Sequence, residues 1–297
     1  MITIIFNPAS GSASNVEILR AQFPEGADIV YRPTEQPADS LRFAIEAARG
    51  GSDTIIAAGG DGTISDVLNG IMEGGAADVR LGIFPLGTGN DLARSVYTTD
   101  DKSRIAQLLK DGVERRVDVV RMTSTDTTRF FLNASGGGFS AELSRDIHAS
   151  AIKHWLGSLS YAVTGAVALP KATSHSAEIV FDGDEKISVD LVNIVISNGR
   201  FIGGGIAIAP TALLDDGLLN VLLTPDLPVA AIIANAKLLM EGQVMQSVDM
   251  VLRTARRIEI RAKPPMLFNA DGEIIGAGDF TFEVMPRALR LIADPGA

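Results

Sequence analysis

Residues 54–71 read TIIAAGGDGTISDVLNGI, and this stretch decides the fold class. A short apolar run ends at a set of glycines, and apolar side chains then recur at helical spacing from Ile64 to Ile71. The glycines let the backbone approach a bulky anion. The N-terminus of the following helix offers N–H groups that favour phosphate. The stretch therefore predicts a strand, a phosphate-binding loop and a helix in succession.

The same alternation of strands and helices runs through residues 1–120. Strands at this spacing, each followed by a helix, imply a parallel sheet covered on both faces. We therefore expect a Rossmann-like parallel α/β domain here, with residues 287–297 as a candidate for completing it. The expected strands are 2–6, 28–31, 54–57 and 81–84, and the expected helices before residue 54 are 15–22 and 38–49.

Beyond Val117 the pattern changes to short strand-like runs, many of them joined by Asp-Gly or Asn-Gly turn signals. Two helical stretches interrupt these runs. We expect residues 121–286 to form a separate, mainly antiparallel β domain, and the run Leu289–Ile292 suits either domain. The strand-like runs are 129–133, 177–181, 189–197, 218–223, 258–260 and 280–284.

Composition narrows the classes of function. The net charge of −10 argues against a nucleic-acid partner, because binding a phosphate backbone relies on positive charge. The same charge opposes long-range attraction to an anionic lipid surface. The absence of Cys excludes disulfides and thiolate sites and suits a reducing cytoplasm. Residues 1–6 lack a basic region and a long apolar core, so we expect no signal peptide.

Three glycine-rich loops follow strands at the same expected sheet edge, where ligands of open α/β sheets bind: residues 7–12, 59–63 and 85–91. Each loop alone is weak, because Gly, Asn, Ser and Pro are ordinary turn residues, but three at one edge are more specific. Asp61 makes sense beside a phosphate only with a cation between them. The plain alternative is a tight turn in which Asp61 or Thr63 caps the helix. No Walker lysine motif is present.

Two acidic turns precede strand-like sequence in the second domain. Residues 213–218 read LLDDGL and residues 268–273 read FNADGE. Asp-Gly is a common hairpin signal, so a simple turn is the alternative to a functional role for both.

Taken in order, these motifs resemble the diacylglycerol kinase catalytic family, which includes bacterial lipid kinases and the sphingosine and ceramide kinases. The resemblance rests on Asn7-Pro8-x-Ser10-Gly11, Gly59–Thr63, Leu86–Asp91, Asp216-Gly217 and Asp271-Gly272-Glu273, and it spans nearly the whole chain. It implies an N-terminal α/β nucleotide domain and a mainly antiparallel β-sandwich domain, with the active site in the cleft between them.

The resemblance also implies ATP and Mg²⁺ as cofactors and assigns roles to single residues. Glu273 matches the general base, and Asp61 is the second catalytic carboxylate. Asp61, Asp91 and Asp118 match acidic positions that organise Mg²⁺·nucleotide. A second Mg²⁺ would take the carbonyls of Leu213 and Leu218 and the carboxylate of Asp216, because hard cations prefer oxygen ligands. The nucleotide contacts would come from Asn7, Ser10, Gly11, Thr34, Gly59, Gly60, Asp61, Gly62, Thr63, Ile64, Ser65, Thr88 and Asp91.

The chain departs from the family pattern at Ser12, where many relatives have lysine, which puts one phosphate contact in doubt. Arg94 or the run Glu114-Arg115-Arg116 offers positive charge instead, with solvated surface charge as the alternative.

Three other functions compete with the lipid kinase. Gly136–Ala141 fits a dinucleotide fingerprint, but the acidic residue expected about 20 positions later is missing. An NAD kinase-like small-molecule kinase shares the Gly-Gly-Asp-Gly motif, but the Asn-Pro-x-Ser-Gly start and the Asp-Gly-Glu end favour lipid kinases. A non-catalytic nucleotide- or lipid-binding protein would lack the carboxylates, all of which are present.

The sequence thus predicts an ATP- and Mg²⁺-dependent transfer of the γ-phosphate to a hydroxyl of a membrane lipid, diacylglycerol or a relative, in phospholipid metabolism. We expect a cytoplasmic protein with weak, reversible, peripheral membrane contact. Residues 155–169 are apolar but too short to span a bilayer, and they suit either an interface segment or a core helix. The oligomeric state stays open, with a homodimer as one option. A basic cluster could add attraction: Arg253, Arg256, Arg257, Arg261 and Lys263.

Overall fold

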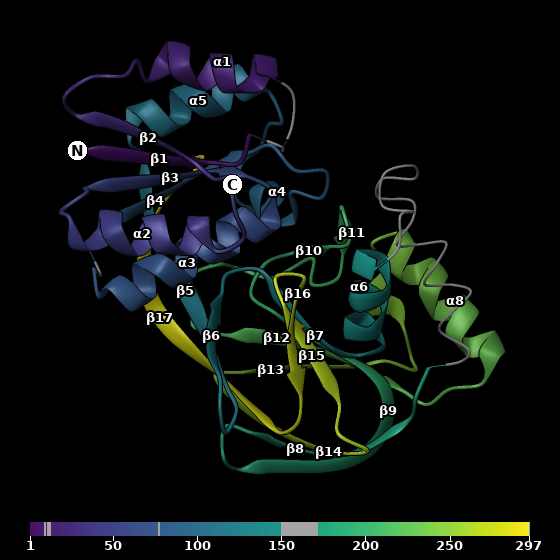
Figure 1. Ribbon diagram of the computed structural model, residues 1–297. Coiled ribbons are helices and arrows are strands. Elements are labelled where there is room, and N and C mark those ends of the chain that lie inside the picture. Colours follow the sequence, from purple (N-terminus) through teal and green to yellow (C-terminus); the bar gives the residue numbers. More distant parts are fainter. Residues whose placement is uncertain (9, 11–12, 77, 150–171, 297) are drawn as a thin grey trace. The chain divides into compact units, whose positions relative to one another are not determined.

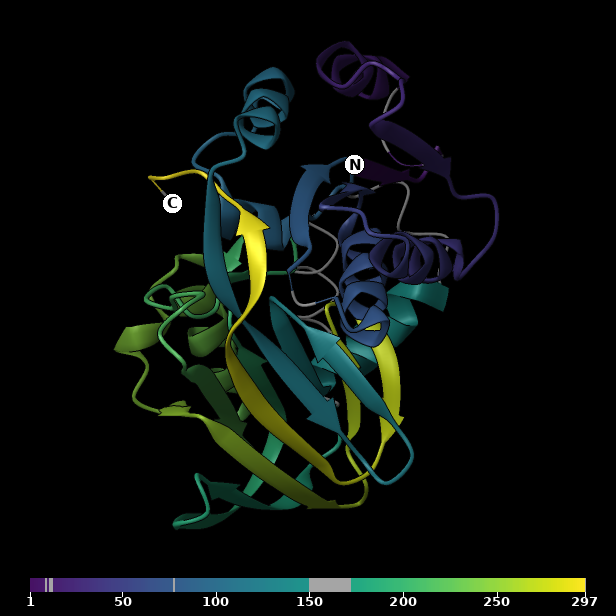
Figure 2. The same ribbon diagram turned by 90° about the vertical axis from the view of Figure 1, so that its left-hand side faces the viewer.

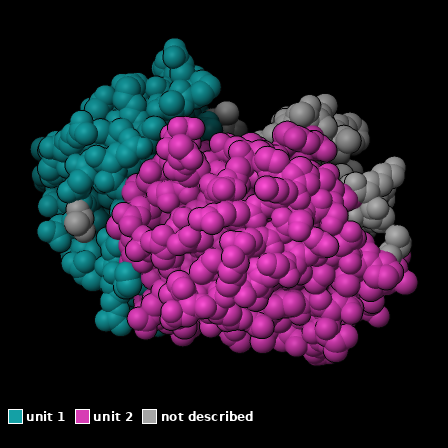
Figure 3. All heavy atoms as spheres, turned by 90° about the horizontal axis from the view of Figure 1, so that it is seen from below, with its two compact units in different colours: residues 1–119, 286–297 teal, residues 120–285 magenta. Residues whose placement is uncertain are grey.

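A computed structural model describes residues 1–8, 10, 13–76, 78–149 and 172–296 (Figure 1). The chain divides into two compact units (Figure 3). Unit 1 comprises Met1–Val119 together with Pro286–Ala297, and unit 2 comprises Val120–Met285. Two strands, β5 (Glu114–Thr123) and β17 (Phe280–Ile292), contribute residues to both units (Figure 2).

Unit 1 is built on a parallel sheet with the strand order β2-β1-β3-β4. The end of β17 pairs in parallel with the outer side of β4, so the expected strand at 289–292 is the last part of one long strand. Consecutive residues of β1 and β3 are fully buried, which shows that both faces of the sheet are covered. The strands are β1 (Ile2–Phe6), β2 (Ile29–Pro33), β3 (Thr54–Gly59) and β4 (Arg80–Pro85).

Helices cover this sheet on both faces (Figure 1). Helices α1 (Ala13–Gln22) and α5 (Lys102–Asp111) pack together on one face, and α2 (Asp39–Arg49) and α3 (Asp61–Gly74) pack together on the other. Strand β1 is followed by a helix on the first face and β3 by a helix on the second. The strand order therefore reverses between β1 and β3, which is where ligands of such sheets bind.

Helix α3 approaches α2 closely because it presents glycine at the contact. A Cβ atom on Gly70 would lie 2.5 Å from the Cβ of Ala44 and 2.7 Å from the carbonyl oxygen of Leu41. A Cβ on Gly74 would lie 2.8 Å from the Cβ of Ala48. This contact fixes the helix that begins at the glycine-rich loop.

Unit 2 is mainly antiparallel, with the strand order β16-β15-β7-β9-β8-β14-β17, and β12 and β13 continue outward from β9. Aromatic rings fill its core, where the centroids of Phe268 and Phe280 lie 5.0 Å apart. The further elements are β6 (Thr128–Phe131), β7 (Ala134–Gly138), α6 (Phe139–Ala149), β8 (His175–Phe181), β9 (Glu185–Ser197), β10 (Phe201–Ile202), β11 (Ile206–Ala207), β12 (Leu219–Pro225), α8 (Val229–Met240), η3 (Val244–Gln246), β13 (Val251–Ala255), β14 (Arg257–Lys263), β15 (Leu267–Ala270) and β16 (Glu273–Ala277).

The glycines that mimic a dinucleotide fingerprint serve packing. They lie in β7, an antiparallel strand, and a Cβ on Gly137 would lie 2.4 Å from the ring of Phe268. A Cβ on Gly138 would lie 2.6 Å from the carbonyl oxygen of Val192. Antiparallel pairing on this strand gives no βαβ unit, so the structure adds a second reason against an oxidoreductase.

The helix contact yields a test. We expect Gly70→Ala to lower the free energy of unfolding by about 1–3 kcal/mol, because the added methyl group overlaps α2. Gly26→Ala is the matched control, since nothing lies within 4 Å of its Cβ position. Denaturant unfolding measures both variants. Equal stability of Gly70→Ala and Gly26→Ala would show that α2 and α3 do not pack this closely.

Candidate functional site

The loops at the carboxyl ends of the parallel strands are tied to one another by backbone hydrogen bonds. The Asn7 N–H donates to the carbonyl of Ala58 at 3.2 Å, and the Thr34 N–H donates to that of Phe6 at 2.9 Å. The Leu86 N–H donates to the carbonyl of Gly59 at 2.8 Å. The predicted nucleotide contacts at Asn7, Thr34 and Gly59 therefore lie along one edge of the sheet.

Two of these loops touch through their backbones. A Cβ atom on Gly87 would lie 2.6 Å from the Cα of Gly60, so the contact requires glycine at position 87. Thr63 is buried, and a Cβ on Gly59 would lie 2.4 Å from its Oγ1. The glycines of the Gly-Gly-Asp-Gly motif thus permit close packing within unit 1 as well as an approach by a ligand.

Asp61 links the same two loops through its side chain. The alternative in which Asp61 or Thr63 caps α3 is not what the structure shows, because the N-cap of α3 is Gly60 and it has no side-chain cap. Instead, Oδ2 of Asp61 accepts the N–H of Asn90 at 3.1 Å. Asn90 begins α4 (Asp91–Val96), so Asp61 caps a different helix from a distant position in the sequence.

The carboxylates of Asp61 and Asp91 both lie close to Gly89. A Cβ on Gly89 would lie 2.8 Å from Oδ2 of Asp61 and 3.8 Å from Oδ2 of Asp91. Burial and then the charge of Asp91 raise the pKa of Asp61 to about 6, against the lowering effect of the backbone N–H groups of Asn90 and Asp91. Two crowded like charges of this kind suit a cation between them and a phosphate.

The donor set fits Mg²⁺ in the form that kinases use. The described residues contain no group of three or more His, Asp or Glu side chains that would enclose a metal ion. Mg²⁺ in kinase sites is commonly held by one or two carboxylates together with substrate phosphates and water. Asp61 and Asp91 offer two carboxylates that fit this pattern, and their role as Mg²⁺ ligands stays a prediction.

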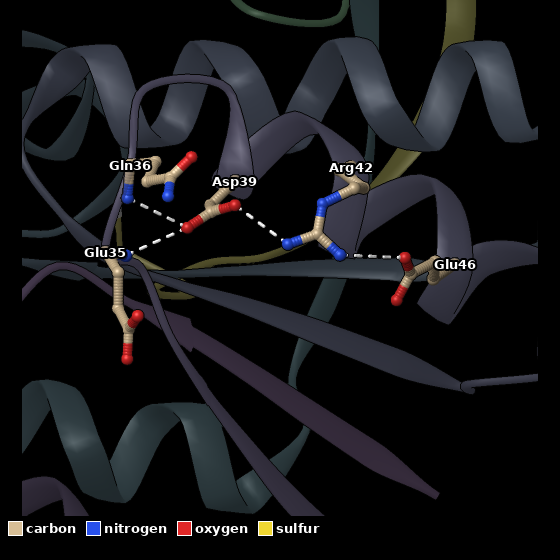
Figure 4. Close-up of polar contacts among 5 residues, drawn as sticks. All are labelled: Glu35, Gln36, Asp39, Arg42 and Glu46. Carbon is tan, nitrogen blue, oxygen red and sulfur yellow. Dashed lines mark hydrogen bonds and ion pairs between the residues drawn. The ribbon is translucent and has the colours of Figure 1, made fainter.

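The loop that carries Thr34 is fixed by Asp39 (Figure 4). The Asp39 carboxylate accepts the N–H groups of Glu35 and Gln36, each at 2.9 Å, and a guanidinium N–H of Arg42 at 2.8 Å. The hydrogen bond from Arg42 is the main cause that lowers the pKa of Asp39 to about 2. Asp39 therefore stays ionised and holds the loop at every physiological pH.

The remaining predicted residues of unit 1 differ in their surroundings. Ser65 is buried and its Oγ has no hydrogen-bond partner, whereas Ser10 donates its N–H to the Asn7 carbonyl. Gly62, Ile64 and Thr88 belong to the glycine-rich loops or the start of α3. Gly11 and Ser12 lie outside the described residues.

Arg94 and Asp118 have contacts that the sequence does not reveal. The Nε of exposed Arg94 donates to the carbonyl of Gly89 at 3.4 Å, so the charge of Arg94 lies beside the loop that leads to Asp91. Asp118 is fully buried, and its carboxylate accepts the N–H of Arg287 at 2.7 Å, where β17 has a positive φ of 50°. This contact gives Asp118 a structural role, and its metal role stays a prediction.

In unit 2, the Asp-Gly-Glu motif forms the turn between β15 and β16. Asp271 and Gly272 have φ values of 46° and 87°, as a tight antiparallel hairpin requires. The carboxylate of Asp271 accepts three backbone N–H groups, from Leu132, Asn133 and Ala134, at 3.0–3.3 Å. This clamp separates β6 from β7, and it explains why the expected strand at 129–133 is interrupted.

Glu273, the predicted base, has a different environment from Asp271. Its Oε2 accepts a hydrogen bond from Nη2 of Arg129 at 2.5 Å, and its side chain is 34% exposed. Asp271 is engaged by backbone N–H groups, whereas the role of Glu273 as a base stays a prediction. Arg129 was missed from the sequence because it lies 144 residues from Glu273 and belongs to no motif.

The second acidic turn shows a local hydrogen bond. Oδ1 of exposed Asp216 accepts the N–H of Leu218 at 3.0 Å, and Gly217 has a φ of 74°. Leu213 is exposed in the same turn before β12. The described contacts are those of an ordinary Asp-Gly turn, and the Mg²⁺ site at Leu213, Asp216 and Leu218 stays a prediction.

The sequence predicted two surfaces for membrane contact, residues 155–169 and the basic cluster, and the structure describes only the second. Residues 155–169 lie outside the described part of the chain. Three members of the basic cluster pair with carboxylates, namely Arg253 with Glu185, Arg257 with Glu259 and Arg261 with Glu178. Among the residues described, no helix has the length and apolarity needed to cross a bilayer.

The raised pKa of Asp61 predicts a pH-dependent stability in metal-free protein. The unfolded side chain ionises near its ordinary value of 3.8, but the folded one keeps its proton up to about pH 6. Stability should therefore fall as the pH rises through this window, and Asp61→Asn should recover on the order of 2–3 kcal/mol at pH 7.5 and about a third of that at pH 4.5.

Thermal melting in EDTA at pH 4.5, 6 and 7.5 measures this difference. Asp39→Asn is the control of opposite sign: Asp39 stabilises above its unfolded pKa, and this contribution is lost only as the pH falls through about 2. Asp39→Asn should thus be destabilised equally at pH 4.5 and 7.5. A pH-independent effect of Asp61→Asn would contradict the prediction.

Solved structures resemble the whole chain. A diacylglycerol kinase from Bacillus anthracis str. Sterne aligns with a TM-score of 0.81 and 24% identity over 99% of this chain and 97% of that one. An NAD kinase from Archaeoglobus fulgidus in complex with ATP aligns with a TM-score of 0.55 and 14% identity over 99% and 94%. At these identities the likeness concerns the fold, which is the predicted α/β domain with an antiparallel β-sandwich domain.

Sequence comparison is more specific. The diacylglycerol kinase catalytic domain matches residues 1–122, and the YegS C-terminal NAD kinase beta sandwich-like domain matches residues 135–293. The "Probable lipid kinase YegS-like" of Xanthomonas euvesicatoria pv. vesicatoria is 33% identical over 90% of this chain and 87% of its own. The "Diacylglycerol kinase" of Bacillus subtilis (strain 168) is 30% identical over 92% and 89%. The chain therefore belongs to the diacylglycerol kinase catalytic family, and it is a kinase.

Proposed function

We propose that this kinase uses ATP and Mg²⁺ to phosphorylate a hydroxyl group of a membrane lipid, diacylglycerol or a close relative. The observation that carries the proposal is the pair of glycine-rich loops joined by Asp61, together with the Glu273 carboxylate left available in the Asp-Gly-Glu turn. The names of the relatives, lipid kinase and diacylglycerol kinase, support the class of acceptor.

The loops of unit 1 bind the nucleotide in this proposal. The N-terminus of α3, a helix of 14 residues, offers backbone N–H groups to the phosphates beside Gly59 and Gly60. Thr34 and Thr88 contact the nucleotide, and Arg94 replaces the lysine that relatives have at Ser12. Asp61 and Asp91 hold Mg²⁺, which neutralises charge on the phosphates when it is bound.

The transfer itself needs positioning and charge neutralisation more than covalent help. The lipid hydroxyl oxygen forms a bond to the γ-phosphorus while the bond from that phosphorus to the β,γ-bridging oxygen breaks. ADP leaves with the electron pair, and the hydroxyl proton passes to the Glu273 carboxylate. General-base help of this kind contributes about 10²–10⁴-fold to the rate.

Membrane contact is proposed for the segment from α8 to Val248, which follows η3. Large apolar side chains are exposed along this segment of unit 2, and they are Ile233, Met240, Met245 and Val248. Met245 also lines a hollow of about 340 Å³ with Val195, Leu222 and Leu252. An apolar surface suits an acidic protein with a largely paired basic cluster, because insertion of apolar side chains does not depend on positive charge.

The experiment that decides the function is incubation with γ-labelled ATP, Mg²⁺ and separate acceptors. Label in diacylglycerol or another lipid supports the proposal and names the substrate class. Label in NAD instead would establish the NAD kinase-like alternative. Binding of ATP without transfer to any acceptor, lipid mixtures included, would favour a non-catalytic binder.

We expect Glu273→Gln to lower kcat by at least about 10²-fold and to leave the KM for ATP unchanged, because the amide cannot take the hydroxyl proton. Glu283→Gln is the matched control, since Glu283 pairs with Arg121 in the same unit but lies outside the turn. Steady-state kinetics with the labelled lipid measure both. Turnover of Glu273→Gln within a few-fold of the wild type would remove Glu273 from the chemistry.

The membrane proposal is tested with the double variant Met245→Ser/Val248→Ser. We expect weaker co-sedimentation with vesicles of neutral phospholipid, because each substitution removes apolar surface at a cost of about 25 cal/mol per Å² lost from the lipid contact. Val113→Ser is the control, because Val113 is an exposed apolar residue of unit 1. If both proteins bind vesicles as the wild type does, the segment does not face the membrane.

A further inference from the structure

The contact between Arg129 and Glu273 joins two strands that no sequence motif connects. Arg129 lies on β6, where its backbone faces Met122 of β5, and Glu273 is the first residue of β16. We propose that Arg129 is a positioning residue that holds the Glu273 carboxylate for proton transfer. The inference rests on the proposed function, in which Glu273 is the base.

The contact engages one oxygen of the carboxylate. Nη2 of Arg129 donates to Oε2 of Glu273 at 2.5 Å, and the described contacts leave Oε1 for another donor. A guanidinium bound to one oxygen restricts the rotation of the carboxylate. The second oxygen then lies ready to accept the proton of a substrate hydroxyl.

Arg129 is suited to this role by its burial. Its side chain is 19% exposed, so solvent screens the pair less than it screens an ordinary surface ion pair. Arginine stays protonated throughout the pH range of enzymes, so it keeps its charge while Glu273 gains and loses a proton.

The hairpin that carries Glu273 is anchored without Arg129. Asp271 accepts three backbone N–H groups from residues 132–134. Asn269 accepts the N–H of Gly136 at 2.8 Å and donates to Oγ of Ser144 at 2.9 Å. Loss of Arg129 should therefore free the Glu273 side chain without releasing the β15–β16 turn.

Unit 2 supplies a matched control pair. Nη2 of Arg121 contacts Oε2 of Glu283 at 2.6 Å, and Arg121 lies on β5 directly opposite Phe130 of β6. The side chains of Arg121 and Glu283 are 43% and 37% exposed, and neither residue belongs to the Asp-Gly-Glu turn. A variant of Arg121 thus removes the same kind of contact from the neighbouring strand.

The test compares Arg129→Met, Arg129→Lys and Arg121→Met in the lipid kinase assay. We expect Arg129→Met to lower kcat by about 10–100-fold, the scale on which a misplaced catalytic group acts, with the KM for ATP within about twofold. Arg129→Lys should recover part of kcat, and Arg121→Met should match the wild type.

A double variant separates this inference from the proposed function. If Arg129 acts through Glu273, Arg129→Met/Glu273→Gln is no slower than Glu273→Gln alone. An additional loss in the double variant, or wild-type kcat in Arg129→Met beside a slow Glu273→Gln, overturns the inference and leaves the proposed base intact. Wild-type turnover of Glu273→Gln overturns the proposed base itself. Thermal melting of each variant sets an assay temperature at which all of them are folded, and Arg129→Lys keeps the test open if Arg129→Met is unstable.

Discussion

The architecture of the nucleotide edge depends on the close contact between Gly60 and Gly87. A Cβ on Gly87 would lie 2.6 Å from the Cα of Gly60, and a Cβ on Gly89 would lie 2.8 Å from Oδ2 of Asp61. Glycine at these two positions therefore lets the Asp61 carboxylate accept the N–H of Asn90 at the start of α4. In this position the Asp61 carboxylate accepts backbone N–H groups, but its negative charge lies beside that of Asp91 and is largely shielded from water. The conflict is relieved by a proton at low pH or by a cation at neutral pH. A Mg²⁺ ion there, as proposed above, would offset the charges of both carboxylates.

In unit 2, the neighbouring carboxylates of Asp271 and Glu273 differ in their hydrogen-bond partners. The Asp271 carboxylate accepts three backbone N–H groups. Glu273, two residues later, accepts a hydrogen bond from Arg129 through one oxygen. The two acidic residues of the Asp-Gly-Glu motif thus have different hydrogen-bond partners, which sequence spacing alone does not distinguish.

The fold was predicted from local periodicity, because buried parallel strands and amphipathic helices have characteristic patterns within short windows of sequence. The structure and the family match confirm an α/β domain followed by an antiparallel β-sandwich domain. The misses involve partners distant in sequence. Asp61 caps α4 rather than α3, and β17 continues past the bend at Arg287, where Asp118 supplies the hydrogen bond. No window of sequence contains both members of such a pair, so their contacts become visible only in three dimensions.

The distribution of charge bears on how an acidic protein attracts a polyanionic nucleotide. With a net charge of −10, the overall field repels ATP, so attraction must arise locally. Arg253, Arg257 and Arg261 are each offset by a glutamate. Arg94 differs, because the partner that the structure gives it is the neutral carbonyl of Gly89, on the loop that carries Asp91. The Arg94 guanidinium and a helix N-terminus, together with a Mg²⁺ ion if one binds as proposed, would concentrate positive potential where the phosphates are needed. Screening by salt confines that potential to about 10 Å at 0.1 M, so the loops would select the nucleotide at short range while the rest of the surface stays repulsive to polyanions.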